Sequence, residues 1–94
     1  MTSFAKLIKA KRRRRGLSLA SLAALARTSA PYLHRLEHGH GLPSDDLVRR
    51  LIDALGLEVD KAFLAAGRVP PDVVRYFVRN PRALDVVRRR MAAA

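Results

Sequence analysis

Two short helical segments separated by a tight turn occupy residues 17–39, and their spacing constrains the fold more than any other feature. The first segment begins at the cap residue Ser18 and is built from Leu, Ala and Ser through residue 25. The second begins at Ser29 and places three apolar side chains on one helical face, namely Tyr32, Leu33 and Leu36. Ala23 falls where the two helices cross, and its small side chain lets them pack at a steep angle.

Positive charge is concentrated in the same part of the chain. The first 36 residues contain nine Lys or Arg residues and no acid, whereas residues 37–94 contain ten basic and eight acidic residues. Two helices crossing in this way form a helix-turn-helix, which presents its second helix to the major groove of double-stranded DNA. A strong positive field over that pair indicates a polyanionic partner. The segment 4–15 lacks the apolar face that inserts into lipid, so no membrane partner is expected.

Helical patterning continues along the rest of the chain, and no segment alternates as a strand does. The first of five predicted helices spans about residues 3–14 and is stopped by Gly16, and the others begin at Ser18, Ser29, Ser44 and Glu58. Outside the crossing pair, apolar residues at helical spacing are expected in the core: Phe4, Leu7, Ile8, Leu47, Val48, Leu51, Ile52, Leu55, Phe63 and Leu64. The sequence therefore predicts an all-α domain over residues 1–67.

A break at Pro70 and Pro71 separates this domain from a C-terminal extension over residues 68–94. The extension is predicted to form two amphipathic helices, at about 72–79 and 82–91, that are too short to be stable alone. They must pack on the five-helix core, on a second copy of the chain or on another protein. We expect a homodimer formed through their apolar residues, which are Val73, Val74, Phe77, Val78, Leu84 and Val87.

Matched positions across residues 4–66 make a family resemblance specific. They include Gly16, Leu17, Ser18, Leu22, Ala23, Ala26, Ser29, Tyr32, Leu33, Arg35, Leu36, Glu37, Gly39, Pro43 and Ser44, followed by the run Ala54 to Leu57. This pattern resembles the phage repressor and Cro family, often called Xre. The resemblance implies a five-helix repressor-like fold and a sequence-specific DNA-binding regulator, commonly a dimer on a two-fold-symmetric operator.

The resemblance also implies which residues meet DNA. The second helix of the pair would face the groove through Ala30, Pro31, His34 and Arg35, with Ser29 at its N-terminus near a phosphate. Independently of the resemblance, His34 and His38 lie four residues apart on one helical face and are expected to contact phosphates or bases. Arg35 fits a bidentate contact to guanine O6 and N7, although a phosphate-bound or solvated arginine is the alternative. Arg13 and Arg14 are expected to face phosphates or solvent. Ser18 and Leu19 mark a second helix N-terminus, which is expected to lie near the DNA backbone.

Two departures from the family pattern and one expected ion pair bear on this arrangement. Leu19 stands where many family members have Gln, so a side-chain contact to the DNA backbone is lost. Arg27 stands where the turn usually has Gly, and a left-handed conformation there would cost about 1 kcal/mol. The resemblance pairs Glu37, the only acid in the first 44 residues, with Arg12, and such a bridge would lock the first helix to the recognition helix. The alternative is an exposed Glu that neutralises nearby arginines.

Catalytic, metal and cofactor sites are not expected. The chain has no cysteine, and His34, His38 and His40 lack an acid or thiol to complete a tetrahedral metal site. The serines are accounted for as cap or helix residues, without a histidine and carboxylate to activate them. We therefore expect that the protein is not an enzyme. We also expect a cytoplasmic, nucleoid-associated bacterial protein.

Three functional hypotheses remain open. The first is a small dimeric repressor that binds an operator. The second is a DNA-binding, antitoxin-like or protease-responsive member of a regulatory pair, whose C-terminal helices bind a protein. In the third, Ala30 and Pro31 mark a protein-binding surface and DNA is no partner, which the charge of the first 36 residues argues against.

Overall fold

The computed structural model describes residues 3–94, and residues 1 and 2 of the predicted first domain lie outside the described part. Over residues 3–94 the chain forms seven helices and no strand, so the all-α prediction is confirmed. Each helix begins within one residue of its predicted start. The helices are α1 (Phe4–Arg14), α2 (Leu19–Ala26), α3 (Ala30–Glu37), α4 (Asp45–Leu55), α5 (Val59–Ala65), α6 (Pro71–Arg79) and α7 (Ala83–Ala93).

Serine side chains begin the first four helices. The hydroxyl oxygens of Ser3, Ser18, Ser29 and Ser44 each accept a hydrogen bond from the backbone amide three residues later, at 3.0–3.3 Å. Such a cap satisfies one of the amides that a helix N-terminus leaves without a partner. The same residue type therefore sets where the two helices of the crossing pair start.

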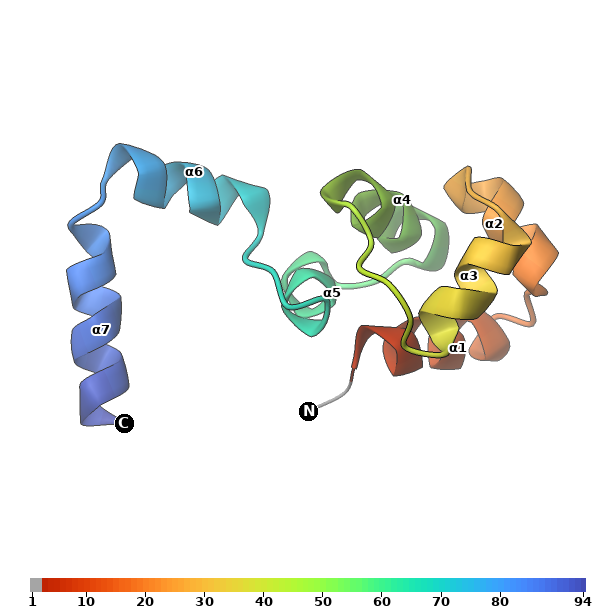
Figure 1. Cartoon of the computed structure of the whole chain (residues 1–94), viewed down its shortest axis with the longest axis horizontal. Helices are drawn as coiled ribbons and strands as arrows, with labels where there is room; N and C mark the ends of the chain where they lie inside the picture. The colour runs from red at the N-terminus through yellow and green to blue at the C-terminus, as the bar shows by residue number, and fades with distance from the viewer. Residues whose placement is uncertain (1–2) are drawn as a thin grey trace.

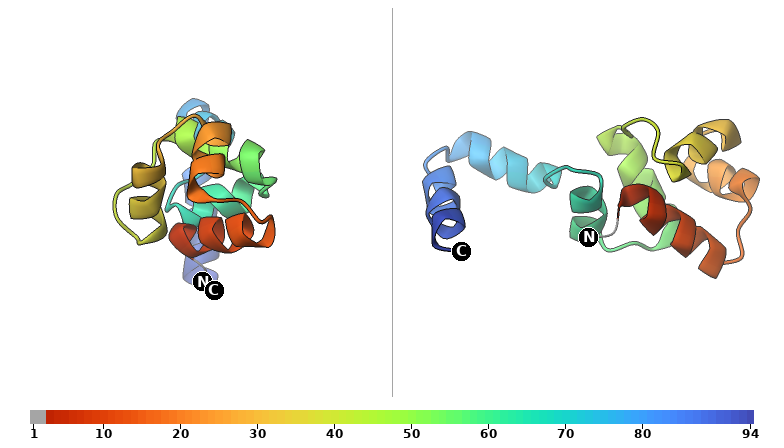
Figure 2. Two further views of the ribbon diagram at one scale, coloured as in Figure 1. Left: turned by 90° about the vertical axis from the view of Figure 1, so that its right-hand side faces the viewer. Right: turned by 60° about the horizontal axis from the view of Figure 1, so that its bottom comes forward.

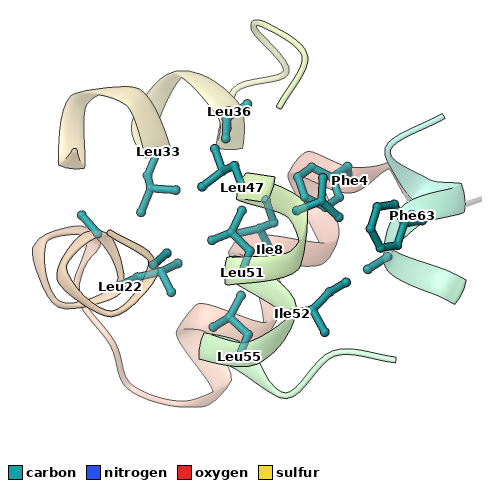
Figure 3. Packing of buried hydrophobic residues seen from close by; sticks show 14 residues of the cluster. Phe4, Ile8, Leu22, Leu33, Leu36, Leu47, Leu51, Ile52, Leu55 and Phe63 are labelled. Atoms are coloured by element: carbon teal, nitrogen blue, oxygen red, sulfur yellow. The ribbon is translucent and has the colours of Figure 1, made fainter. Parts of the chain in front are cut away.

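The hydrophobic core lies between α1, α2, α3, α4 and α5 (Figure 3). Helix α4 crosses its middle and contributes five buried residues, because its apolar positions recur with the period of one helical face. Most of the predicted core is buried, but Leu7 is only half-buried and Leu64 is 57 % exposed. The prediction for Leu64 was wrong because Ala62 and Phe63 turn toward the core, which leaves the next side chain of α5 facing solvent.

The last two helices stand away from this core (Figure 1). Neither α6 nor α7 contains a buried residue, and α7 lies at the end of the molecule opposite α2 and α3 (Figure 2, right). The molecule is accordingly elongated, with a longest dimension of 44 Å against 26 and 22 Å. Among residues 3–94, no helix combines the length and apolar character that a membrane crossing requires.

Candidate nucleic-acid interface

Helices α2 and α3 cross closely because small side chains lie between them. Ala23 is 5 % exposed and Ala26 is fully buried, so the crossing forms as the sequence predicted. The turn that follows places Arg27 in the left-handed region, with φ 54° and ψ 52°. The amide of Thr28 donates to the carbonyl of Ala23 at 2.9 Å, which closes the end of α2.

Helix α3 has one face in the core and one face in solvent. Leu33, Leu36 and Glu37 are buried, and the opposite face exposes Ser29, Pro31, His34, Arg35 and His38, with Ala30 half-buried. The predicted groove-facing residues are therefore brought together on one accessible surface. The hydroxyl of Ser29 accepts a bond from the amide of Tyr32 and keeps its own hydrogen for an external acceptor.

The long side chains on this face are arranged in two pairs. The guanidinium of Arg35 lies 5.4 Å from the centroid of the Tyr32 ring, within the range of a cation–π contact. The rings of His34 and His38 lie 4.2 Å apart, and Nδ1 of His38 is 2.7 Å from the carbonyl oxygen of His34. Both pairs narrow the directions in which these side chains point.

Helix α1 is tied to α3 by a two-pronged ion pair. Arg12 donates from Nε and Nη2 to the two carboxylate oxygens of Glu37, at 2.6 and 2.8 Å, and from Nη1 to the carbonyl of Leu17 at 2.9 Å. The side chain of Glu37 is only 3 % exposed, which rules out the alternative of a solvated acid. The hydrogen bonds that Arg12 donates to Glu37 raise the pKa of Arg12 above its ordinary value, although burial opposes this shift.

A family model described as a helix-turn-helix domain matches residues 3–64, about two thirds of the chain. The chain belongs to the helix-turn-helix family. This confirms the helix-turn-helix prediction and agrees with the resemblance to the phage repressor and Cro family. The family implies a regulator that binds double-stranded DNA. No curated protein and no solved structure matches the chain.

The remaining predicted contact residues lie at the junction of α1 and α2 in the helix-turn-helix domain. Arg13 and Arg14 are exposed in the last turn of α1, beside the N-terminus of α2 rather than on α3. The hydroxyl of Ser18 donates to the hydroxyl of Ser21 and accepts from the amide of Ser21, so its hydrogen is already used within the helix cap. The side chain of Leu19 packs against the core, which leaves its backbone amide as the group that can meet a phosphate.

One structural residue of the helix-turn-helix domain was missed by the sequence analysis. Arg50 of α4 donates from Nε to the carbonyl oxygen of Ala26 at 2.8 Å, at the end of α2. The sequence contains only an indirect signal for this contact. Helix α2 carries no basic residue in its own last turn, so a donor to its C-terminal carbonyl groups must come from another element. The turn between the two helices is thus supported from behind by α4.

Proposed function

We propose that this protein is a sequence-specific transcriptional regulator, a repressor that binds a near-palindromic operator as a dimer. The observation that carries the proposal is the solvent-facing side of α3, where Ser29, Pro31, His34 and Arg35 are all exposed in a domain of the helix-turn-helix family. A helix of this kind lies in the major groove with its N-terminal residues near base edges. Such a regulator works at the chromosome, so the cytoplasm and nucleoid are its proposed location.

Arg35 is the proposed base-reading residue. Its planar guanidinium matches the two acceptors of guanine, O6 and N7, and the ring of Tyr32 holds it in a limited range of directions. Ala30 and Pro31 are too small and apolar for hydrogen bonding, and they suit contact with a thymine methyl group. Ser29 and the N-termini of α2 and α3 are the proposed phosphate contacts.

Selection of DNA fragments by the purified full-length protein, followed by sequencing, tests this proposal. We expect one near-palindromic sequence to be enriched, and Arg35→Ala to lose about 1 to 3 kcal/mol on it while relaxing the preference at one base pair. His34→Ala is the matched control on the same face and should lose less. Equal weakening on every sequence would make Arg35 a phosphate contact, and the absence of any enriched sequence would refute sequence-specific regulation.

The dimer is proposed to form through the apolar residues of α6 and α7. Val74, Val78 and Val87 are 45 %, 73 % and 40 % exposed, and helices this short require a partner surface. A two-fold dimer would place two recognition helices about one DNA turn, or 34 Å, apart.

A second candidate rests on the same two helices. Because α6 and α7 bury no residue in the single chain, they suit a DNA-binding, antitoxin-like or protease-responsive protein that uses them to hold a different protein. Co-purification of the tagged chain from its own host separates the candidates. Recovery of the chain alone, at twice its own mass, supports the homodimer, and recovery of a second protein in fixed ratio supports the regulatory pair.

A further inference from the structure

A cleft of about 620 Å³ lies between the N-terminus of α4 and the start of α6. Its walls are Ser44, Asp45, Asp46, Arg68, Val69 and Val74. Asp45 already pairs with Arg68 at 2.9 Å, whereas Asp46 forms no ion pair within residues 3–94. Val69 and Val74 are each 45 % exposed. The cleft therefore combines an apolar wall with a carboxylate that lacks a cation.

Helix α7 carries the complementary combination, namely apolar side chains beside arginines. Arg88, Arg89 and Arg90 are exposed, next to Val87 at 40 % and Met91 at 69 % exposure. Of these arginines only Arg88 approaches an acid, Asp85, at 3.8 Å. The charge of the chain divides in the same way, since residues 37–67 contain six acids and three bases, whereas residues 68–94 contain seven arginines and two acids.

Helix α7 does not reach the cleft of its own chain. The cleft meets α6 at Val74 near its beginning, whereas α7 follows the far end of α6 and lies at the end of the molecule away from the core (Figure 1). The arm formed by α6 and α7 thus carries its basic, apolar end outward, where a second molecule is accessible to it.

We propose that α7 of a second copy of this chain docks in the cleft between α4 and α6, and that the two copies exchange their arms reciprocally. The inference rests on the proposed homodimer and specifies what the arm contacts. Val87 and Met91 would cover Val69 and Val74, and the arginines of α7 would supply the missing cation to Asp46. Each dimer would contain this contact twice.

Charge favours docking of α7 in the cleft over direct pairing of one arm with another. Two arms placed face to face would bring together two segments with six arginines and two acids each, which repel. Docking in the cleft instead sets opposite charges against each other around apolar groups, as complementary interfaces do.

A charge exchange on the full-length protein tests the contact. Asp46→Arg reverses the cleft, and the triple change Arg88→Glu, Arg89→Glu, Arg90→Glu reverses the arm. Each variant alone brings like charges together, so its dimer should dissociate at about tenfold or more higher concentration than the unchanged protein. In an equimolar mixture of the two variants both contacts regain opposite charges, and a mixed dimer should form at the unchanged protein's concentration range.

Asp60→Arg is the matched control, because Asp60 occupies the second position of α5 as Asp46 does in α4, but lies outside the cleft. Its dimer should match the unchanged protein by light scattering, and circular dichroism should show all variants folded. Persistent dimers in both single variants, or no mixed dimer on mixing, would overturn the arm exchange while leaving the dimeric regulator standing. An unchanged protein that is monomeric with and without operator DNA would overturn both.

Discussion

Arg27 is the one residue besides glycine, within residues 3–94, that adopts a positive φ. Its side chain is exposed, so the left-handed conformation is imposed by the turn between α2 and α3 rather than by packing of the side chain. We expect Arg27→Gly to raise the free energy of unfolding by about 0.5 to 1 kcal/mol, because glycine adopts this conformation without steric strain. Urea denaturation of the two proteins measures the difference.

Arg27→Ala separates strain from charge, since alanine keeps the strain and removes the guanidinium. Its stability should stay close to that of the unchanged protein. If the Arg27 guanidinium contacts a DNA phosphate, its removal should lower DNA affinity equally in the glycine and alanine variants. If alanine stabilises as much as glycine does, backbone strain is not the cause.

The Arg12–Glu37 pair gives the largest expected effect of a single side chain. Glu37→Ala leaves a mostly buried guanidinium without its carboxylate, which should lower the free energy of unfolding by about 3 kcal/mol. Arg68→Ala removes the exposed pair with Asp45 and should cost less than about 1 kcal/mol, since solvent screens it. A double change of Arg12 and Glu37 to methionine should recover much of the loss, and denaturant midpoints for the four proteins check the ranking.

At the scale of the helices, the sequence predicted the starts of α1 to α4 well because each of these starts depends on one local residue. The serine caps of α1 to α4 are legible in the sequence, and so are the apolar positions of α4. Side chains whose environment depends on distant segments were harder to place. Leu64 is exposed because no other helix covers that side of α5, and Arg50 reaches α2 across 24 residues of sequence. The exposed face of α3 was predictable because helical periodicity fixes it, whereas the contact between Tyr32 and Arg35 depends on side-chain conformations that periodicity does not define.

The separation of α6 and α7 from the core predicts the result of truncation. Stopping the chain after Gly67 removes no buried residue except Pro70, so α1 to α5 should remain folded with nearly the same helical signal per residue. The truncated protein should be monomeric by light scattering and bind operator DNA far more weakly than the full chain, because one recognition helix replaces two. If both chains have the mass of a monomer and bind DNA with equal affinity, α6 and α7 have no role in self-association.

For the molecule as a whole, the concentration of positive charge in residues 1–36 predicts strongly salt-dependent binding. About five phosphates neutralised per monomer would give a slope near −4 to −5 in a plot of log affinity against log salt concentration. Changing Arg13 and Arg14 to alanine should reduce the magnitude of that slope by about one for each residue that contacts phosphate. Binding measured over a salt series gives both values, and an unchanged slope would show that these arginines stay solvated.

The ion pair between Arg12 and Glu37 also has a consequence for the heat capacity change of DNA binding. It fixes the arginine-rich end of α1 to the C-terminal end of α3, so the two parts of the surface keep one mutual orientation before any ligand arrives. The loss of conformational entropy that this orientation requires occurs during folding, and association then approaches the docking of preformed bodies. For the helix-turn-helix domain we therefore expect a heat capacity change that reflects contact area alone, without the larger negative contribution of coupled folding.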